Sequence, residues 1–536
     1  MRREGAVFTA RLPAAAGDGY FYVLDDGPAL PDPVSRLLPE GVHGPSEIVD
    51  PEAFRWSDHA WRGLDLREYI LYELHVGTFT PQGTFDGVLE RLDYLKGLGI
   101  SAIELMPVAA FPGTRNWGYD GASPYAVQAS YGGPEGLKRL VDAAHRAGLA
   151  VVLDVVYNHL GPEGNYLSRF GPYFTSRHHT PWGDAINYDG PEAPEVRRYF
   201  VENALYWVRE YHLDGVRLDA VQTICDESPK HIVHEIAESV HQLARELGRR
   251  VTVIAETDEN DARYFRPRER GGYGVDAVWS DDFHHALHAV LTREREGYYQ
   301  DFGRKEQLVR ALNEGFAFQG EPFNFWDGRP RGTPAPEVPL YRHVICTQNH
   351  DQVGNRARGE RLTELGPRGA RKLAAALLLL APHTPLLFMG QEYDEQAPFQ
   401  YFTGHGDPAL QKAVSEGRRK EFQQFTWDQV PDPQDAATFE RSKIRLQASG
   451  SGRQAEMLAW YRALIDLRRR AVMSGERTCR AELREGTIVM QAPAQAPRVM
   501  VVAGFPASGA YDPGAGWKPV LGAGEDGYRT EVYERA

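Results

Sequence analysis

The sequence predicts an α/β protein: a (β/α)8 TIM barrel with a truncated N-terminal β segment and a small C-terminal β-sandwich. Apolar runs of strand length alternate with helix-period segments from about residue 67 to residue 470, and most of these runs are continuous. Continuous apolar runs are typical of parallel strands that are covered on both faces. Eight strand–helix units joined by right-handed crossovers would close into a barrel.

Eight candidate strands lie in this alternating part of the chain. They are Tyr69–Phe79, Ala102–Val108, Ala150–His159, Gly215–Ala220, Val253–Glu256, Ala277–Asp281, His343–Asp351 and Pro385–Gln391.

Apolar stripes with a helical period lie between the strands. The clearest are Leu89–Leu98, Leu137–Ala144 and Ile232–Leu243. Pro134 and Gly148 flank the second stripe with residues typical of a helix start and stop. An open doubly wound sheet is the alternative fold, and it is less favoured because no Gly-x-Gly-x-x-Gly loop follows the first strand.

The segments before and after the barrel region differ from it in composition and in the length of their predicted strands. Residues 1–62 are rich in Pro, Gly and Asp and offer only short strands such as Tyr20–Leu24, which suggests the remnant of a β-sandwich and a linker. We assign residues 63–474 to the barrel with its loop insertions. Residues 475–536 follow the amphipathic stretch Met457–Arg470 and contain short strands, so we expect a small sandwich there.

Two connections in the barrel region are unusually long. Gly161–Pro194 and Gln319–Pro339 exceed ordinary loops, and barrel insertions of this kind usually build the substrate site.

Charge, cysteine content and hydropathy exclude several classes of protein. The net charge of −14 argues against a nucleic-acid partner and suits a neutral substrate. The longest apolar run, Leu373–Ala381, is too short to span a membrane. The three cysteines are far apart, so we expect no disulfides and a cytoplasmic location. Arg11 and Pro13 interrupt any signal-peptide core.

Polar residues gather where the predicted strands end. His159 ends the third strand, Asp219 the fourth, Glu256 the fifth and Asp351 the seventh. In a barrel these strand ends converge on the face that carries the active site. Arg217 lies two residues before Asp219 and therefore on the same side of its strand.

Such a set suits the cleavage of glycosidic bonds, which needs two carboxyl groups with different tasks. Arg217 would keep the Asp219 carboxylate ionised for attack on the anomeric carbon. Glu256 emerges from an apolar strand, where desolvation would raise its pKa and leave it protonated. Asp351 would bind sugar hydroxyls and distort the ring. The remaining candidates for sugar contacts are His159, His350 and Tyr119.

Each residue alone has a simpler interpretation. A single carboxylate at a strand end is more often a helix cap or a solvated charge, and the functional interpretation rests on four strands that carry such groups together. His284, His285 and His288 could suggest a metal, but no carboxylate or thiolate pattern completes a site. Asn158 could bind a structural calcium ion, but no calcium-binding loop accompanies it. We therefore expect neither a metal nor a cofactor.

These clusters resemble the signature regions of the alpha-amylase superfamily of glycoside hydrolases. The matching segments are Asp154–His159, Gly215–Asp219, Glu256 and Asn349–Asp351. The resemblance implies Asp219 as nucleophile, Glu256 as proton donor and Asp351 as transition-state stabiliser. It further implies that the cleaved sugar is held by Tyr119, His159, Arg217 and His350.

From about residue 18 to residue 471, the chain also resembles the maltooligosyltrehalose trehalohydrolase family within this superfamily. The motifs that carry this narrower resemblance are Pro31–Arg36, Gly41–Ser46, Tyr72–Phe79, Asp281–His285, Gln348–Arg356 and Ser415–Phe422. It implies hydrolysis of the alpha-1,4 bond beside the terminal trehalose of a maltooligosyltrehalose. It also implies substrate contacts by Asp281, His285 and Asn355. The chain departs from the family at its front, where most of an N-terminal sandwich is missing.

Three other functions remain open from sequence. A glycogen branching enzyme or a generic alpha-amylase would share the barrel and the carboxylates, and the Asp281–His285 motif favours the trehalohydrolase over them. A catalytically dead glucan-binding relative would be expected to have lost a catalytic carboxylate, and all three are present.

Overall fold

A closed barrel of parallel strands forms the centre of the computed structural model, which describes residues 2–4, 7–421, 430–445 and 452–536. The strand order is β11-β14-β15-β16-β19-β20-β7-β8, with closure from β8 back to β11. The strands are β7 (Leu71–Leu74), β8 (Ala102–Leu105), β11 (Ala150–Val155), β14 (Gly215–Leu218), β15 (Thr252–Glu256), β16 (Ala277–Trp279), β19 (His343–Cys346) and β20 (Thr384–Phe388). All eight predicted strands are confirmed, and the open sheet is ruled out.

Seven of the eight strands end earlier than predicted at the carboxyl rim of the barrel, and β15 ends at Glu256 as predicted. After β7 the chain turns into the short helix α1 (Val76–Phe79), and after β19 it turns into α10 (His350–Gly354). The Asn349 side chain caps α10 by accepting a hydrogen bond of 2.7 Å from the Gln352 amide. His159, Asp219 and Asp351 therefore lie beyond their strands at the rim, whereas Glu256 is the last residue of β15 and still pairs with Trp279.

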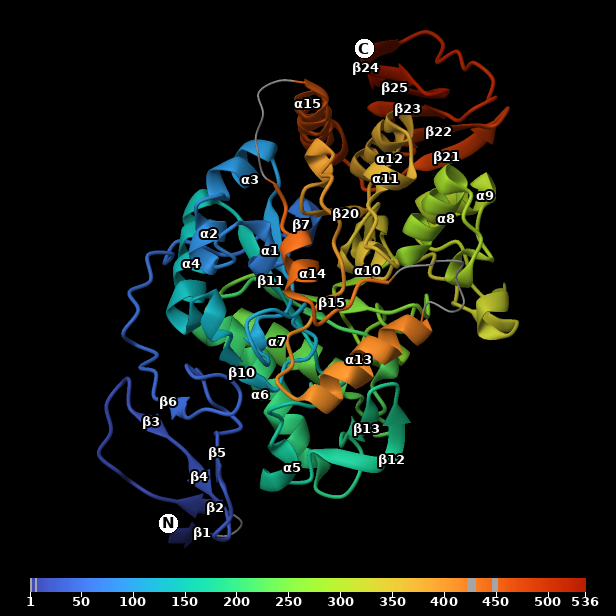
Figure 1. Cartoon of the computed structure of the whole chain (residues 1–536). Coiled ribbons are helices and arrows are strands. Elements are labelled where there is room, and N and C mark those ends of the chain that lie inside the picture. Colours follow the sequence, from blue (N-terminus) through green and yellow to red (C-terminus); the bar gives the residue numbers. More distant parts are fainter. Residues whose placement is uncertain (1, 5–6, 422–429, 446–451) are drawn as a thin grey trace.

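Helices surround the barrel (Figure 1). They include α2 (Phe85–Leu89), α3 (Leu92–Leu98), α4 (Gly133–Ala147), α6 (Ala193–Glu210), α7 (Ile232–Leu247), α8 (Asp281–Thr292), α9 (Lys305–Glu314), α11 (Leu362–Leu365), α12 (Arg368–Leu380) and α15 (Gly452–Leu467).

The predicted apolar stripes lie on α2 and α3, on α4 and on α7, as expected. Helix α4 ends at Gly148 with φ of 81°, a conformation that glycine adopts without strain. The connection from β15 to β16, which the structure describes throughout, contains the 3-10 turn Arg268–Arg270 in place of a helix.

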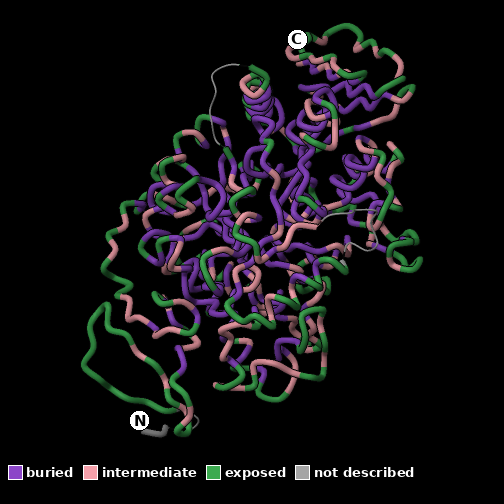
Figure 2. The backbone as a smooth tube through the Cα atoms, in the orientation of Figure 1, coloured by how far each residue is buried: buried purple, intermediate pink, exposed green. Residues whose placement is uncertain are grey.

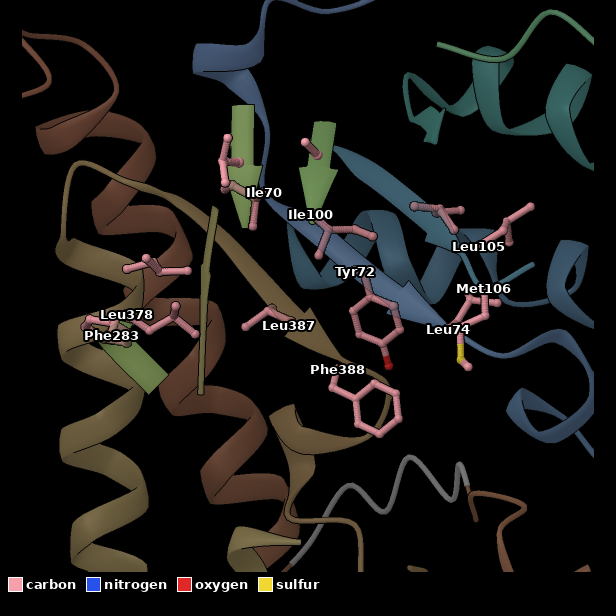
Figure 3. Packing of buried hydrophobic residues seen from close by; sticks show 14 of the residues in the cluster. Ile70, Tyr72, Leu74, Ile100, Leu105, Met106, Phe283, Leu378, Leu387 and Phe388 are labelled. Carbon is pink, nitrogen blue, oxygen red and sulfur yellow. The ribbon is translucent and has the colours of Figure 1, made fainter. Parts of the chain in front are cut away.

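Alternate residues of each barrel strand face opposite sides. Inside the barrel, the half nearer the amino ends of the strands is filled by apolar side chains such as Leu71, Val152 and Ile254. The outward residues pack under the helices, as Figure 3 shows for Tyr72 and Leu387. This two-sided burial explains why the strands read as continuous apolar runs.

Further along the strands, the inward positions become polar. In the parallel register Glu73 lies beside Glu104, Asp154 beside Arg217, and Glu256 beside Trp279. The upper interior of the barrel is therefore a layer of charged side chains that support the carboxyl rim.

The long connections carry structure of their own. Residues 161–194 contain α5 (Leu167–Phe170) and a hairpin of β12 (Phe174–Thr180) and β13 (Gly183–Ile186). Residues 319–339 contain the hairpin of β17 (Glu321–Phe323) and β18 (Arg329–Arg331). A further short ladder joins β9 (Ala109–Ala110) to β10 (Ser123–Val127). Beyond β20 lie α13 (Pro408–Glu421) and α14 (Ala436–Arg441).

The C-terminal region takes the form of one antiparallel sheet in place of the expected two-sheet sandwich. Its order is β21-β22-β23-β25-β24. The strands are β21 (Arg480–Arg484), β22 (Thr487–Ala492), β23 (Val499–Gly504), β24 (Trp517–Glu525) and β25 (Tyr528–Arg535). The sheet needs no second sheet because α12 and α9 of the barrel pack against it (Figure 1).

In its described residues, 2–4 and 7–62, the N-terminal segment forms three separate two-stranded ladders and no complete sandwich. Their strands are β1 (Arg2–Glu4), β2 (Val7–Thr9), β3 (Gly19–Tyr20), β4 (Tyr22–Val23), β5 (Ala29–Leu30) and β6 (Ser46–Glu47). Much of this segment is exposed, in contrast to the barrel (Figure 2). The boundaries of the three proposed domains remain predictions.

No helix in the described part of the chain has both the length and the apolar character needed to cross a bilayer.

Candidate active site

Arg217 is the centre of the charged cluster at the carboxyl rim. Its Nη1 donates to both oxygens of Asp154, at 2.9 and 2.8 Å, and to Asp219 Oδ1 at 2.8 Å. Its Nη2 lies 3.6 Å from Glu256 Oε2. The guanidinium is fully buried and stacks on Trp279, with 4.3 Å between Cζ and the ring centroid. One buried cation thus bonds the carboxylates of Asp154 and Asp219 directly and lies within ion-pair distance of Glu256.

Asp219 is held at both carboxylate oxygens. Arg217 donates to Oδ1, and Asn158 Nδ2 donates to Oδ2 at 2.7 Å. Eleven per cent of the Asp219 side chain remains exposed. A carboxylate fixed in this way and still accessible is suited to nucleophilic attack.

Glu256 is a carboxyl group in an environment that favours its neutral form. Burial raises its pKa well above the ordinary value, and the charges of Asp219, Asp351 and Asp281 add to this effect against the opposing pull of Arg217. The Ala220 amide donates to Glu256 Oε2 at 2.6 Å. Because Oε2 is an acceptor there, the proton of the neutral acid belongs on Oε1.

His350 lies between Glu73 and the other charged groups. Glu73 accepts hydrogen bonds from the His350 backbone amide, at 2.9 Å, and from Nδ1. Burial lowers the pKa of His350, but Glu73 and Asp351 outweigh it and raise the pKa to about 9. His350 Nε2 lies 2.7 Å from the Tyr119 hydroxyl, which donates to Asp154 at 2.5 Å. The structure therefore links His350 and Tyr119 to the Arg217 cluster.

Asp351 is the most exposed of the three predicted catalytic carboxylates, with 40% of its side chain exposed. Its Oδ1 lies 3.6 Å from His350 Nε2 and accepts a hydrogen bond of 3.0 Å from Asn355 Nδ2. Asn355 is therefore placed beside a predicted catalytic residue. Its proposed contact with substrate remains a prediction.

Asp281 and His285 lie on α8, on the Asp351 side of the cluster. Burial and the charge of Asp351 raise the pKa of Asp281 to about 7, against Arg331. His285 Nδ1 lies 2.7 Å from the Asp281 carbonyl, and burial lowers the pKa of His285 to about 4. Carboxyl and imidazole side chains one helical turn apart could both bind hydroxyl groups.

His159 is packed between the rim and the β12–β13 hairpin. Its Nδ1 contacts the Asn158 side chain, and its Nε2 lies 3.0 Å from the Tyr119 carbonyl. The exposed ring of Trp182 stacks on it with 4.2 Å between centroids. The amide nitrogen of Asn158 thus bonds Asp219 and its amide oxygen contacts His159.

One group of described side chains has ligand atoms close enough to share a metal ion: His178, Asp189 and Glu227, within 4.8 Å of one another. Arg177 forms ion pairs with both carboxylates of this group. Two of the α8 histidines have other partners, since His288 bonds Glu294 at 2.6 Å and His285 contacts the Asp281 carbonyl.

Glu73 and Asp154 are site residues that the sequence reasoning did not assign a role. Asp154 pairs with Arg217 in the barrel register, and Glu73 bonds His350, so each contacts a residue that the sequence analysis did assign. The signal that could have found them is a carboxylate inside an otherwise apolar strand, since a buried charge needs a partner.

A barrel with three carboxyl groups gathered around one arginine at its carboxyl rim is the arrangement of the alpha-amylase class. The family model "Alpha amylase, catalytic domain" matches residues 48–182. The crystal structure of a Salmonella typhimurium protein described as an alpha amylase superposes with a TM-score of 0.89 at 40% identity, covering 98% of this chain and 91% of that chain.

Curated relatives give a narrower assignment. The malto-oligosyltrehalose trehalohydrolase of Saccharolobus solfataricus is 48% identical over 87% of this chain and 80% of its own length. The protein of the same name from Rhizobium sp. (strain M-11) is 49% identical over 87% of this chain and 79% of its own length. This chain belongs to the malto-oligosyltrehalose trehalohydrolase family of alpha-amylase-type glycoside hydrolases.

Proposed function

We propose that this enzyme cleaves the alpha-1,4 bond next to the terminal trehalose of a maltooligosyltrehalose, releasing trehalose and a maltooligosaccharide with retention of configuration. The observation that carries the proposal is the difference in environment between Asp219 and Glu256. Asp219 accepts hydrogen bonds at both oxygens, one from a cation, whereas burial raises the pKa of Glu256 well above its ordinary value. Such a pair provides a nucleophile and an acid in one site.

In the first step, Asp219 attacks the anomeric carbon while Glu256 gives its proton to the oxygen of the departing trehalose. The bond from that carbon to oxygen breaks, and a covalent glycosyl–Asp219 ester forms. Oε1 is the oxygen of Glu256 that carries the proton, since Oε2 accepts from Ala220. Asp351 would stabilise the positive charge that develops on the sugar ring.

In the second step, water replaces trehalose. Glu256, now ionised, takes a proton from the water, and the hydroxyl oxygen attacks the anomeric carbon and releases Asp219. Two inversions give net retention. Among the proposed substrate contacts, Asp281 and His285 offer a carboxyl group and an imidazole that could bind sugar hydroxyls.

The test is an analysis of products from maltotriosyltrehalose and from maltopentaose. We expect trehalose and maltotriose from the first, cleavage of the first to be much faster than that of the second, and an alpha-anomer in freshly formed maltotriose by proton NMR. Comparable cleavage of both sugars would instead indicate a generic amylase. New alpha-1,6 linkages would indicate a branching enzyme, and a beta-anomer would contradict the role of Asp219.

A further inference from the structure

The carboxylate of Asp351 needs a partner to hold it. Its side chain is 40% exposed, against 11% for Asp219 and 12% for Glu256. Among the described residues, Arg217 bonds Asp219 and lies 3.6 Å from Glu256, but it forms no hydrogen bond with Asp351. An exposed carboxylate samples several rotamers unless a hydrogen bond selects one. Asn355 supplies that bond, because its Nδ2 donates to Asp351 Oδ1 at 3.0 Å.

The amide of Asn355 is itself oriented from a distant part of the chain. Helix α13 brings Arg418 against the end of α10, where Nη1 donates to Asn355 Oδ1 at 3.1 Å and Nη2 donates to the Gly354 carbonyl. The Arg418 side chain is buried, and its guanidinium lies 4.7 Å from the centroid of the Tyr401 ring. Both α10 and α13 are labelled in Figure 1.

Helix α13 is docked independently of that arginine. Ser415, on the same buried side of the helix, donates to Asp432 Oδ1 at 2.7 Å. The motif Ser415–Phe422, which carried part of the family resemblance, thus places two buried polar side chains, Ser415 and Arg418, against neighbouring elements. Phe422 lies outside the described residues.

Arg418 determines which way the Asn355 amide points. An amide side chain can rotate to exchange its oxygen and its nitrogen. A guanidinium can only donate, so it requires the oxygen of Asn355 to face it, and the nitrogen must then face Asp351.

We propose that Arg418 is a positioning residue that acts through Asn355 to hold Asp351 in the orientation needed at the transition state. This inference rests on the role proposed for Asp351. Neither Arg418 nor Asn355 needs to touch the substrate for the link to work.

Such a link has a kinetic signature. Asp351 would act mainly when positive charge develops on the sugar, so misorienting it lowers kcat and leaves KM nearly unchanged. We expect losses in kcat on the order of 10- to 100-fold, as for a small displacement of a catalytic group.

The experiment is a double-mutant cycle with Arg418→Met and Asn355→Ala, assayed on maltotriosyltrehalose and on maltopentaose. Arg419→Met is the matched control, because Arg419 is the next residue of the same helix and is exposed. We expect each single variant to lose kcat, the double variant to be no slower than the slower single variant, KM to stay within about threefold, and Arg419→Met to match the wild type.

The inference is overturned if Arg418→Met keeps kcat within twofold of the wild type, or if the two losses multiply. A rise in KM at constant kcat would also overturn it. If Arg418→Met does not melt cooperatively, Asn355→Ala decides alone, since it breaks the same link and leaves the Gly354 and Tyr401 contacts intact: an unchanged kcat overturns the inference.

The two substrates separate this inference from the proposed function. The wild-type preference between them tests whether trehalose is the leaving group. The link acts on Asp351, which serves either substrate, so the variants should lose kcat by the same factor on both. A wild type without preference for maltotriosyltrehalose would refute the proposed function. The double-mutant cycle could then still be measured and interpreted on maltopentaose.

Discussion

Asp219 would form the covalent bond to the sugar, so its replacement gives the sharpest change expected from one side chain. Asp219→Asn preserves the shape of the group but removes the charge that Arg217 holds. We expect kcat to fall by on the order of 10⁴-fold with substrate binding retained. Trehalose release and calorimetric titration with maltotriosyltrehalose measure the two quantities.

Asp93→Asn is a suitable control for this change, since Asp93 is exposed on α3. It should behave as the wild type. Substantial residual turnover in Asp219→Asn would exclude Asp219 as the nucleophile.

Glu73 would affect the reaction indirectly, because it bonds His350. It accepts hydrogen bonds from two His350 nitrogens, and its charge is the largest contribution that raises the His350 pKa to about 9. The other charged or titratable groups around this ring are Asp351, Arg217, Glu104, Asp154, Tyr119 and His75.

We expect Glu73→Gln to lower the pKa of His350 from about 9 toward or below its ordinary 6.5, because burial then acts with one fewer opposing charge. A pH titration of selectively labelled histidine by NMR measures it. In the wild type, His350 remains a cation at neutral pH. A titration of His350 that is unchanged in Glu73→Gln would contradict the assignment of Glu73 as its partner.

At the scale of elements, a buried network ties the segment before β7 to the amino-terminal side of the barrel. His145 of α4 lies 2.8 Å from Asp58 through Nδ1 and 2.8 Å from Asp214 through Nε2. Trp61 stacks on His145 and donates to Asp214 at 2.7 Å. These contacts join residues 58–61 to α4 and to the start of β14.

Loss of His145 should therefore lower the stability of the whole barrel. His145→Ala leaves two buried carboxylates without their shared partner, and we expect the free energy of unfolding at pH 6 to fall by about 3 to 5 kcal/mol. Urea denaturation measures this. His179→Ala is the control, since His179 is 68% exposed, and it should change stability by less than about 0.5 kcal/mol.

The same pair of variants has a defined pH dependence. Burial lowers the pKa of His145, but its hydrogen bonds to Asp214 and Asp58 outweigh burial and raise the pKa above the ordinary 6.5. The charge of His145 thus contributes fully below pH 6.5, and its contribution is lost as the pH rises through the raised pKa. The deficit of His145→Ala should shrink toward alkaline pH, and a deficit that grows there would contradict this arrangement.

At the scale of the whole molecule, the C-terminal sheet and the barrel share one apolar core. Ile488, Val501 and Val532 are fully buried and belong to the same cluster as the barrel helices, and α12 packs against β23, β24 and β25. The sheet and the N-terminal segment lie at opposite ends of the molecule (Figure 1).

A chain that ends at Ser474 should consequently lose its cooperative thermal transition, because removing the sheet exposes the apolar side of α12. Calorimetry and the fluorescence of a hydrophobic dye measure this outcome. Lys518→Ala, an exposed change on β24, should melt as the wild type does. A shortened chain with unchanged melting would show that the barrel is independent of the sheet.

Much of this architecture could be predicted from local patterns. Leu95 and Leu98 recur at a helical spacing, and Arg217 and Asp219 are two residues apart on one strand, so both features are visible in a short window of sequence. The strand ends were harder to predict: the apolar run through Phe79 continues beyond Leu74, where the barrel ladder ends and α1 begins.

By itself, the sequence determined the eight strands, their order and the polar groups at their ends, since strand and helix periodicity are properties of neighbouring residues. Tertiary structure alone decided which of these groups meet. Arg217 reaches Asp154 and Arg418 reaches Asn355, each across 63 residues. Likewise, only packing against α12 and α9 showed that one C-terminal sheet suffices. Contacts of this kind depend on barrel closure and helix docking, which no short stretch of chain encodes.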